Sequence, residues 1–362
     1  MELIKPKKLE KGDTVALITL SWAGAYLYND RYLTGKKQLA ETFNLKVIET
    51  PNALKDEDWI YNNPKERLAD LIWAFKNPEI KAIFTIIGGD DGIRLLQYLE
   101  DEDLDVIKKN PKIFVGFSDT TVTNFICLKA GIVTFYGPAV LFGFAENGGI
   151  DNYTKDYFKK ALFKSAPIGL IKNSKDGWIL DKVPWEKGYE NIIRKRQDFI
   201  DYKLIQGKGR IKGKLVGGCI DVLEFIKGTK IWPNLDFWKN KVLFIETSED
   251  KPSKDLFISW LRNYGAQGIL NNLNGIIMGI PGGDIAYNDP EYEYKLKNQK
   301  KLFQEYEQAL TQVSKEFHRE DIIIVTQLNF GHTMPMLTIP MGCEIEIDAD
   351  NKKIKIIEKA VE

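Results

Sequence analysis

The sequence predicts an α/β protein whose N-terminal part is a flavodoxin-like, doubly wound parallel sheet, followed by a second β/α domain. Between Gly12 and Pro138, apolar segments rich in β-branched and aromatic residues alternate with helix-length segments. Such alternation is typical of a parallel sheet covered by helices. A length of 362 residues with 44% hydrophobic content is sufficient for two separately packed cores.

The strands expected in the first domain are residues 12–20, 45–50, 81–87, 112–115 and 132–136. A helix is expected over 64–75, where Leu68, Leu71 and Ile72 are spaced for one apolar face. Ligands of doubly wound sheets bind beyond the carboxyl ends of the strands. Short polar or glycine segments follow four of the predicted strands and should therefore gather along that edge: Ser21, Gly88-Gly89, Ser118 and Gly137.

The strand–helix rhythm stops after the first domain, so we place domains at 1–145 and 203–362, with a crossing segment over 146–202. The second domain is expected to hold strands near 210–217, 241–246, 275–280 and 321–327. An antiparallel pair joined by a turn at 348–351 should close it. The tyrosine- and charge-rich insertion over 281–320 is expected to be a loop followed by a solvated helix.

Charge and cysteine usage exclude several classes of protein. Lys+Arg and Asp+Glu both total 51, so the whole chain has no nucleic-acid footprint. No segment has the length and apolar character of a bilayer span, and the start lacks a signal-peptide core, so we expect a cytoplasmic protein without membrane contact. Cys127, Cys219 and Cys343 are too far apart for C-x-x-C metal spacing and are expected in cores.

Ser118 lies where an apolar strand runs into a helix-type pattern, in the segment K-I-F-V-G-F-S-D-T-T-V-T-N-F-I over 112–126. A serine at such a turn projects its hydroxyl from the sheet edge, toward the free N–H groups of the next helix. This arrangement is typical of a nucleophile elbow. The alternative is an ordinary helix N-cap, which serine or aspartate also favours at this place.

A serine nucleophile requires a base and an acid. His318 and His332 are the only histidines, which disfavours a multi-histidine zinc site but leaves a mixed carboxylate site open. His332 follows an apolar strand, whereas His318 lies in a charged helical context, so His332 is the stronger candidate base. Glu246 ends the strand V-L-F-I-E and is the candidate acid, with Glu249 close behind.

Gly88-Gly89-Asp90-Asp91-Gly92 follows a predicted strand and could supply backbone N–H groups to an oxyanion or form a plain tight turn. The spacing matches neither dinucleotide nor P-loop glycine motifs, and two aspartates would repel phosphate. The N–H of Asp119 would be the second oxyanion donor.

These segments together resemble the LD-carboxypeptidase (S66) family of serine peptidases, which includes the microcin C immunity peptidases. The matching segments occur in family order across almost the whole chain: K-G-D-T-V (11–15), G-G-D-D-G-I-R-L-L-Q-Y-L (88–99), G-F-S-D (116–119), F-Y-G-P (135–138), G-K-L-V-G-G (213–218), L-F-I-E (243–246) and G-H-T-M-P-M-L-T-I-P-M-G (331–342).

The resemblance implies a Ser118/Glu246/His332 triad, with oxyanion N–H groups from Asp119 and the Gly88-Gly89 turn. It also implies a swivelling C-terminal domain, a homodimer, and neither metal nor cofactor. The substrate would be a small peptide-like molecule cleaved at an amide bond near its C-terminus. Murein peptides and microcin C-type peptidyl-nucleotides both meet this description.

The chain departs from the family at positions that bear on the substrate. Cys219 replaces the asparagine that the family often carries after the second-domain glycine pair, which leaves contacts near Gly218 open, and Asp90-Asp91 replaces small or amide residues. The segment with Trp178 and Trp185 resembles the microcin-immunity branch. These tryptophans either stack on a base or aromatic group or serve as packing anchors.

Two other functions remain open from the sequence. The same fold could bind cell-wall peptides without catalysis, as an inactive relative of the peptidases. A nucleotide-binding regulator is the third reading, and the glycine turn gives it little support.

Overall fold

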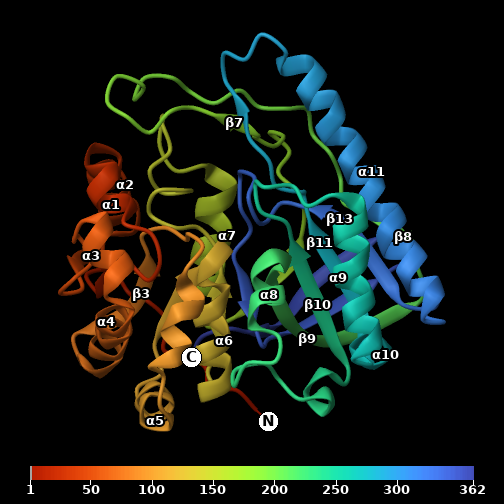
Figure 1. Ribbon diagram of the computed structural model, residues 1–362, viewed down its shortest axis with the longest axis horizontal. Coiled ribbons are helices and arrows are strands. Elements are labelled where there is room, and N and C mark those ends of the chain that lie inside the picture. Colours follow the sequence, from red (N-terminus) through yellow and green to blue (C-terminus); the bar gives the residue numbers. More distant parts are fainter. Residues whose placement is uncertain (1) are drawn as a thin grey trace.

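The computed structural model describes residues 2–362 as a mixed α/β protein with two sheets (Figure 1). The first sheet has the strand order β14-β5-β4-β3-β1-β2. Its five N-terminal strands are parallel and have the flavodoxin-type order 2-1-3-4-5, as predicted. The strands are β1 (Thr14–Ile18), β2 (Lys46–Glu49), β3 (Ile80–Thr85), β4 (Ile113–Gly116) and β5 (Thr134–Tyr136).

Helices connect these strands, and their apolar faces pack on the sheet. Helix α4 (Pro64–Lys76) covers the predicted 64–75 and has proline at its first position, where the missing N–H costs nothing. The remaining elements are α1 (Gly24–Leu27), α2 (Asn29–Phe43), α3 (Glu57–Asn62), the 3₁₀ turns η1 (Gly92–Gln97) and η2 (Ser118–Thr120), α5 (Asp101–Lys109) and α6 (Thr121–Ala130).

The second sheet has eight strands in the order β6-β16-β15-β9-β10-β11-β13-β8. Strands β9, β10, β11 and β13 are parallel, and the predicted closing hairpin of β15 and β16 pairs antiparallel beside β9. The strands are β6 (Pro167–Ile171), β8 (Lys203–Gln206), β9 (Arg210–Cys219), β10 (Lys241–Glu246), β11 (Leu273–Gly279), β13 (Ile323–Leu328), β15 (Glu344–Asp348) and β16 (Lys353–Lys359). Its helical elements are α8 (Ile220–Ile226), η3 (Leu235–Trp238), α9 (Lys254–Ala266), α10 (Ile269–Asn272) and α11 (Tyr292–Glu316).

The two halves exchange segments. Strand β14 (Ile339–Met341), from the C-terminal part of the chain, pairs antiparallel with β5 of the first sheet. The predicted crossing segment contributes helix α7 (Asn152–Leu162) and β6, an edge strand of the second sheet. The two sheets therefore interlock, whereas the sequence suggested a simple division into two domains. The difference arises because local sequence patterns do not identify the distant partner of a strand.

The later part of the crossing segment passes over the top of both halves in Figure 1. There β7 (Asp181–Lys182) pairs with β12 (Ile285–Ala286) from the insertion. Arg194 forms an ion pair with Glu146 at 2.7 Å, and Lys182 forms one with Asp284 at 2.6 Å. The first contact joins the two ends of the crossing segment, and the second joins the segment to the insertion.

Helix α11 lies on the outer side of the second half (Figure 1) and is only partly the solvated helix that the sequence predicted. Its inner face carries buried apolar residues, which the high charge of the segment concealed. Phe303 of α11 contacts the indole of Trp178, with ring centroids 5.5 Å apart. Together with Leu180, Ile280, Ile285 and Leu296, they form a small apolar cluster separate from the main core.

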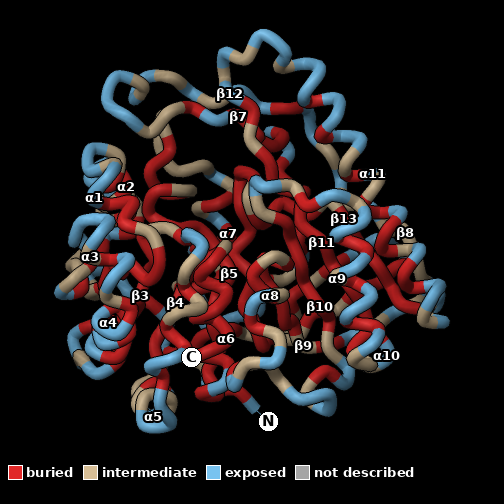
Figure 2. The backbone as a smooth tube through the Cα atoms, viewed as in Figure 1, coloured by how far each residue is buried: buried red, intermediate tan, exposed pale blue. Residues whose placement is uncertain are grey.

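Buried residues follow the strands of both sheets, and exposed residues follow the outer helices and the upper loops (Figure 2). All three cysteines are buried, as expected. Within residues 2–362, no helix combines the length and apolar composition needed to cross a bilayer.

The contact of Phe303 with Trp178 should contribute strongly to stability. Replacing a buried phenylalanine with alanine removes apolar contacts and leaves a cavity, at a cost of about 3–5 kcal/mol. We expect Phe303→Ala to shift the denaturant midpoint clearly downward. Tyr294→Ala, at an exposed position of the same helix, should leave the midpoint nearly unchanged. Equal midpoints for the two variants would contradict this account of α11.

Candidate active site

Ser118 follows strand β4 and begins the turn that leads into helix α6. Its φ of 60° lies in the left-handed region, which a non-glycine residue adopts at an energetic cost. The hydroxyl does not cap the turn or helix that follows; its Oγ lies 2.9 Å from Nε2 of His332. The geometry therefore favours the nucleophile elbow over the N-cap.

His332 lies in the loop after β13, and its ring connects Ser118 to Glu246. Nδ1 lies 2.7 Å from Oε2 of Glu246. The carboxylate can only accept, so Nδ1 donates this hydrogen bond and leaves Nε2 of the neutral ring to accept from the Ser118 hydroxyl. The backbone N–H of His332 also donates to Oε2, at 3.2 Å. The predicted residues Ser118, His332 and Glu246 are thus joined in one hydrogen-bonded chain.

Glu246 ends β10 and is fully buried, so its carboxylate must be satisfied by protein donors. Gly331 permits the close approach of the histidine loop, because a Cβ there would lie 2.4 Å from Oε2 of Glu246. The φ of Gly331 is 96°, which also favours glycine.

Tyr136 completes the environment of Glu246, and the sequence did not single it out. Its hydroxyl donates to Oε1 of Glu246 and accepts the backbone N–H of Ser118 at 3.1 Å. One tyrosine at the end of β5 therefore fixes both the acid and the backbone of the serine. The available signal was its place in F-Y-G-P, directly before Gly137 at the predicted ligand edge.

Electrostatics favour the protonated form of His332. Burial lowers the pKa of the imidazole, but the charge and the hydrogen bond of Glu246 raise it, and Glu249 adds to this effect. The outcome is a pKa raised to about 9. Oε2 of Glu249 lies 3.4 Å from Nε2, on a side chain that is largely exposed.

The glycine turn after β3 lies directly against Ser118. A Cβ on Gly88 would lie 2.9 Å from Cβ and 3.1 Å from Oγ of Ser118, and 3.2 Å from the backbone N of Asp119. At Gly89, whose φ is 146°, a Cβ would meet the hydroxyl of Ser21 at 2.3 Å. Only glycines allow the turn this close to Ser21 and Ser118, which gather at the predicted edge.

Asp91 anchors this turn through a buried arginine. Arg67 is fully buried and donates to the two carboxylate oxygens of Asp91 at 2.7 and 3.1 Å, and to the carbonyl of Leu20 at 2.7 Å. Ser21 Oγ accepts the backbone N–H of Asp91 at 3.2 Å. Asp90, the neighbouring residue, is exposed and lines the cavity.

Asp119 fixes the other end of the turn. Its Oδ2 accepts the N–H of Gly92 at 2.7 Å. Burial raises the pKa of this carboxyl above its usual range, although the hydrogen bond from Gly92 opposes the effect. Asp119, the residue after Ser118, therefore holds the glycine turn in a fixed position relative to the serine turn.

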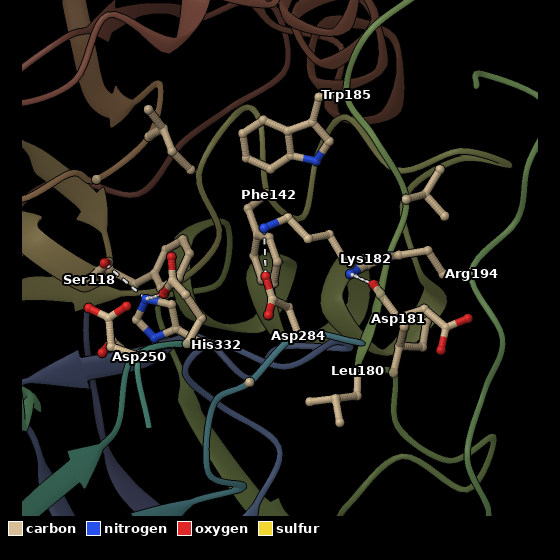
Figure 3. A pocket seen from close by; sticks show the side chains of 18 of the residues that line it. Ser118, Phe142, Leu180, Asp181, Lys182, Trp185, Arg194, Asp250, Asp284 and His332 are labelled. Atoms are coloured by element: carbon tan, nitrogen blue, oxygen red, sulfur yellow. Dashed lines mark hydrogen bonds and ion pairs between the residues drawn. The ribbon is translucent and has the colours of Figure 1, made fainter. Parts of the chain in front are cut away.

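A cavity of about 800 Å³ opens over Ser118 and His332. In Figure 3 this pair lies at one side of the cavity, and Phe142 and Trp185 lie further along it. Trp185 contacts Tyr28 edge to face at 5.4 Å and lies 6.5 Å from Trp22. The three rings are half-buried and form an aromatic surface in the cavity.

Two arginines contact aromatic rings of the cavity. The guanidinium of Arg31 lies 4.8 Å from the ring centroid of Trp185, and Arg194 lies over Phe142 at 5.4 Å. Both arginines pair with Glu146, at 3.7 and 2.7 Å. Burial alone would raise the pKa of Glu146, but the two guanidinium groups lower it below its usual value. The carboxylate therefore stays charged and holds both arginines.

Three of the residues predicted to bind the oxyanion or the substrate, Asp119, Trp178 and Gly218, are not among those that line this cavity. Trp178 is buried against Phe303, so of the two tryptophans only Trp185 lines the cavity and Trp178 is a packing anchor. Gly218 lies against Thr121 of α6, where a Cβ would meet the threonine side chain at 2.6 Å. Its neighbour Cys219 lines the cavity instead.

Among residues 2–362, one cluster has donor atoms spaced for a metal ion: Cys219, Glu246 and His332. Burial, together with the charges of Glu246 and Asp221, raises the pKa of the Cys219 thiol well above its usual range. The sulfur lies 3.3 Å from Oδ2 of Asp221, to which the thiol donates.

Comparison with known proteins relates both halves of the chain to one family of proteins. Residues 15–137 match the LD-carboxypeptidase N-terminal domain, and residues 212–347 match the LD-carboxypeptidase C-terminal domain. The microcin C7 self-immunity protein MccF of Escherichia coli is 27% identical over 97% of this chain and 95% of its own length. A probable murein peptide carboxypeptidase of Bacillus subtilis is 28% identical, covering 99% of this chain and 95% of its own.

A solved structure supports the same relationship. The MccF-like protein from Streptococcus pneumoniae, in complex with AMP, superimposes with a TM-score of 0.81 at 30% identity, covering 95% of this chain and 98% of its own. The two family models lie on the two halves described above, in the same order. The chain therefore belongs to the LD-carboxypeptidase (S66) family.

Proposed function

We propose that this protein is a serine carboxypeptidase that hydrolyses an amide bond near the C-terminus of a small peptide-like substrate. The observation that carries the proposal is the hydrogen-bonded chain from Ser118 through His332 to Glu246. Serine hydrolysis requires a hydroxyl, a base within hydrogen-bonding reach and an acid that orients the base. Three residues in these positions also favour an enzyme over an inactive binder of cell-wall peptides.

In this mechanism Oγ of Ser118 attacks the carbonyl carbon while Nε2 of His332 takes its proton. The imidazolium then donates that proton to the leaving nitrogen, and the acyl group stays on Ser118. A water molecule, deprotonated by His332, releases the acyl group and regenerates the hydroxyl. Glu246 holds the ring through Nδ1 and stabilises its positive charge.

The oxyanion would be bound by backbone N–H groups of Asp119 and the Gly88-Gly89 turn. Their proximity to Ser118 supports this assignment. Donors placed in advance at the developing charge contribute on the order of 3 kcal/mol each. The Arg67–Asp91 pair then acts as a positioning element, because it fixes the turn without contacting the reacting atoms.

For the leaving group we favour a nucleotide or a similarly flat aromatic moiety. Trp22, Tyr28 and Trp185 offer an aromatic surface in the cavity, and stacking on aromatic side chains stabilises a base by about 1–3 kcal/mol. The AMP complex of the MccF-like relative from Streptococcus pneumoniae supports this choice. A murein peptide is the second candidate, supported by the relative from Bacillus subtilis. A cytoplasmic homodimer stays a prediction.

Turnover should depend on the Ser118 hydroxyl. We expect Ser118→Ala to reduce product formation at least about 10⁴-fold, because the attacking atom is lost. Mass spectrometry should follow a peptidyl-aminoacyl-adenylate analogue and a murein tetrapeptide, with faster cleavage of the first. Ser259→Ala, an exposed serine on α9, is the matched control. Full activity of Ser118→Ala would refute the mechanism. A fluorophosphonate that fails to label the unaltered protein would favour the inactive binder.

Replacing Asp91 should affect catalysis more than replacing Asp90. Asp91→Asn weakens the hold of Arg67 on the glycine turn, so we expect kcat to fall by about 10- to 100-fold with little change in KM. Asp90→Asn removes the same charge one residue away without touching Arg67. The ratio of the two kcat values tests whether Asp91 positions the glycine turn. Melting temperatures, measured alongside, show whether each variant remains folded. Equal losses in both variants would contradict it.

The pH profile should report the raised pKa of His332. The base must be neutral, and the imidazole is protonated below about pH 9, so kcat/KM should rise with pH up to that value. Glu249→Gln removes a carboxylate 3.4 Å from Nε2 and should move the limb to lower pH, by less than about one unit because this side chain is exposed. Glu316→Gln on distant α11 should not move it. The measurement requires chelator-treated buffer. A rise of kcat/KM that is complete below pH 7 in the unaltered protein would overturn the prediction.

A further inference from the structure

The sulfur of Cys219 faces the same small space as the candidate base and acid. Cys219 ends β9 and stands opposite Glu246 in the parallel pairing of β9 with β10, and His332 reaches Glu246 from the loop after β13. One donor atom from each of the three residues lies within 4.8 Å of the other two. Thiolate, carboxylate and imidazole are the three kinds of ligand that proteins use for zinc.

We propose that Cys219, Glu246 and His332 form a binding site for a transition-metal ion of the zinc class, and that the bound ion reversibly blocks the catalytic centre. The first half of this proposal concerns binding alone. The second half rests on the proposed function, because blocking has meaning only if His332 acts as the base.

The spacing of the donors suits such an ion. Metal–ligand distances of about 2.0–2.3 Å in a tetrahedral site place ligand atoms roughly 3.6 Å apart, so the cluster needs side-chain movements of about 1 Å to close around an ion. A fourth ligand is available from two carboxylates. Oε2 of Glu249 lies 3.4 Å from Nε2 of His332, and Oδ2 of Asp221 lies 3.3 Å from the Cys219 sulfur.

An ion can reach the cluster from the cavity. Cys219, His332, Asp221 and Glu249 all line it, although Cys219 and Glu246 are themselves buried. Binding would release to solvent the thiol proton and, where the ring of His332 is charged, one ring proton, because cysteine and histidine bind metal only when deprotonated. An ion on Nε2 replaces the hydrogen bond from Ser118, and an ion on Nδ1 replaces the bond to Glu246. Both bonds are required for proton transfer in the proposed mechanism. A protein with the metal ion bound therefore cannot turn over substrate.

Cys219 distinguishes this chain from the asparagine-bearing relatives. Cys219→Asn removes the only sulfur of the cluster and keeps a polar side chain of similar size, which makes it a matched control. Cys343→Ala removes a buried thiol that lies outside the cluster and tests for binding to other cysteines. Ser118→Ala removes the hydroxyl and any turnover while keeping all three donors.

The test measures metal binding and inhibition separately, on the reduced full-length chain. Titration with Co²⁺ should give a thiolate-to-cobalt absorption band in the near ultraviolet for the unaltered protein, Cys343→Ala and Ser118→Ala. Competition with Zn²⁺ should abolish the band, and isothermal titration calorimetry gives the zinc affinity of each protein, including variants that lack the band. We expect Cys219→Asn to lack the band and to bind Zn²⁺ at least about tenfold more weakly. Circular dichroism confirms that each variant is folded.

Inhibition is then followed by the rate of fluorophosphonate labelling of Ser118. Zn²⁺ should slow labelling of the unaltered protein, a chelator should restore it, and Cys219→Asn should need at least about tenfold more Zn²⁺. Equal zinc affinity of the unaltered protein and Cys219→Asn, or absence of the thiolate band, would overturn the site. Binding without slowed labelling would overturn the blocking role. A protein that binds Zn²⁺ through Cys219 but never labels would refute the proposed function and leave the site intact.

Discussion

The burial of one negative charge, the carboxylate of Glu246, is the constraint on which the site depends. A fully buried carboxylate is stable only if charged or polar donors surround it. Glu246 receives the backbone N–H and the ring Nδ1 of His332 together with the hydroxyl of Tyr136. These donors come from segments 110 and 86 residues away in the sequence. Satisfying this charge therefore joins the two sheets at the point where Ser118 lies.

The interlocked topology gives this junction its rigidity. Strand β14 returns from the histidine loop to pair with β5, the strand that carries Tyr136. The loop that holds His332 is thus tied to the second sheet through β13 and to the first through β14. A histidine held between two anchored strands loses little entropy when it contacts Ser118, which is the advantage of a preorganised site.

The residues in which the chain departs from its family lie around this fixed centre. Asp91 binds a buried arginine and holds the glycine turn, while Asp90 faces the cavity. Cys219 brings a sulfur next to Glu246 and His332, where the family resemblance leads us to expect asparagine. The chemistry proposed for Ser118 and His332 therefore takes place beside cavity residues in which this chain departs from the pattern expected for its family. Substrate selectivity and sensitivity to metal ions would depend on these residues.

The sequence by itself determined the elements whose signals are local. β-Branched runs and 3.6-residue spacing predicted the parallel strands of both sheets and helix α4, and strand ends located Ser118, Glu246 and His332. Only the tertiary structure decided what depends on contacts between distant segments. It added β6 and β14 to the sheets, decided that Trp178 is a packing anchor, buried one face of α11, and placed Tyr136 between Ser118 and Glu246. The physical reason is that periodicity reports which face of an element is apolar, whereas its partner is chosen by packing and by the need to satisfy buried polar groups.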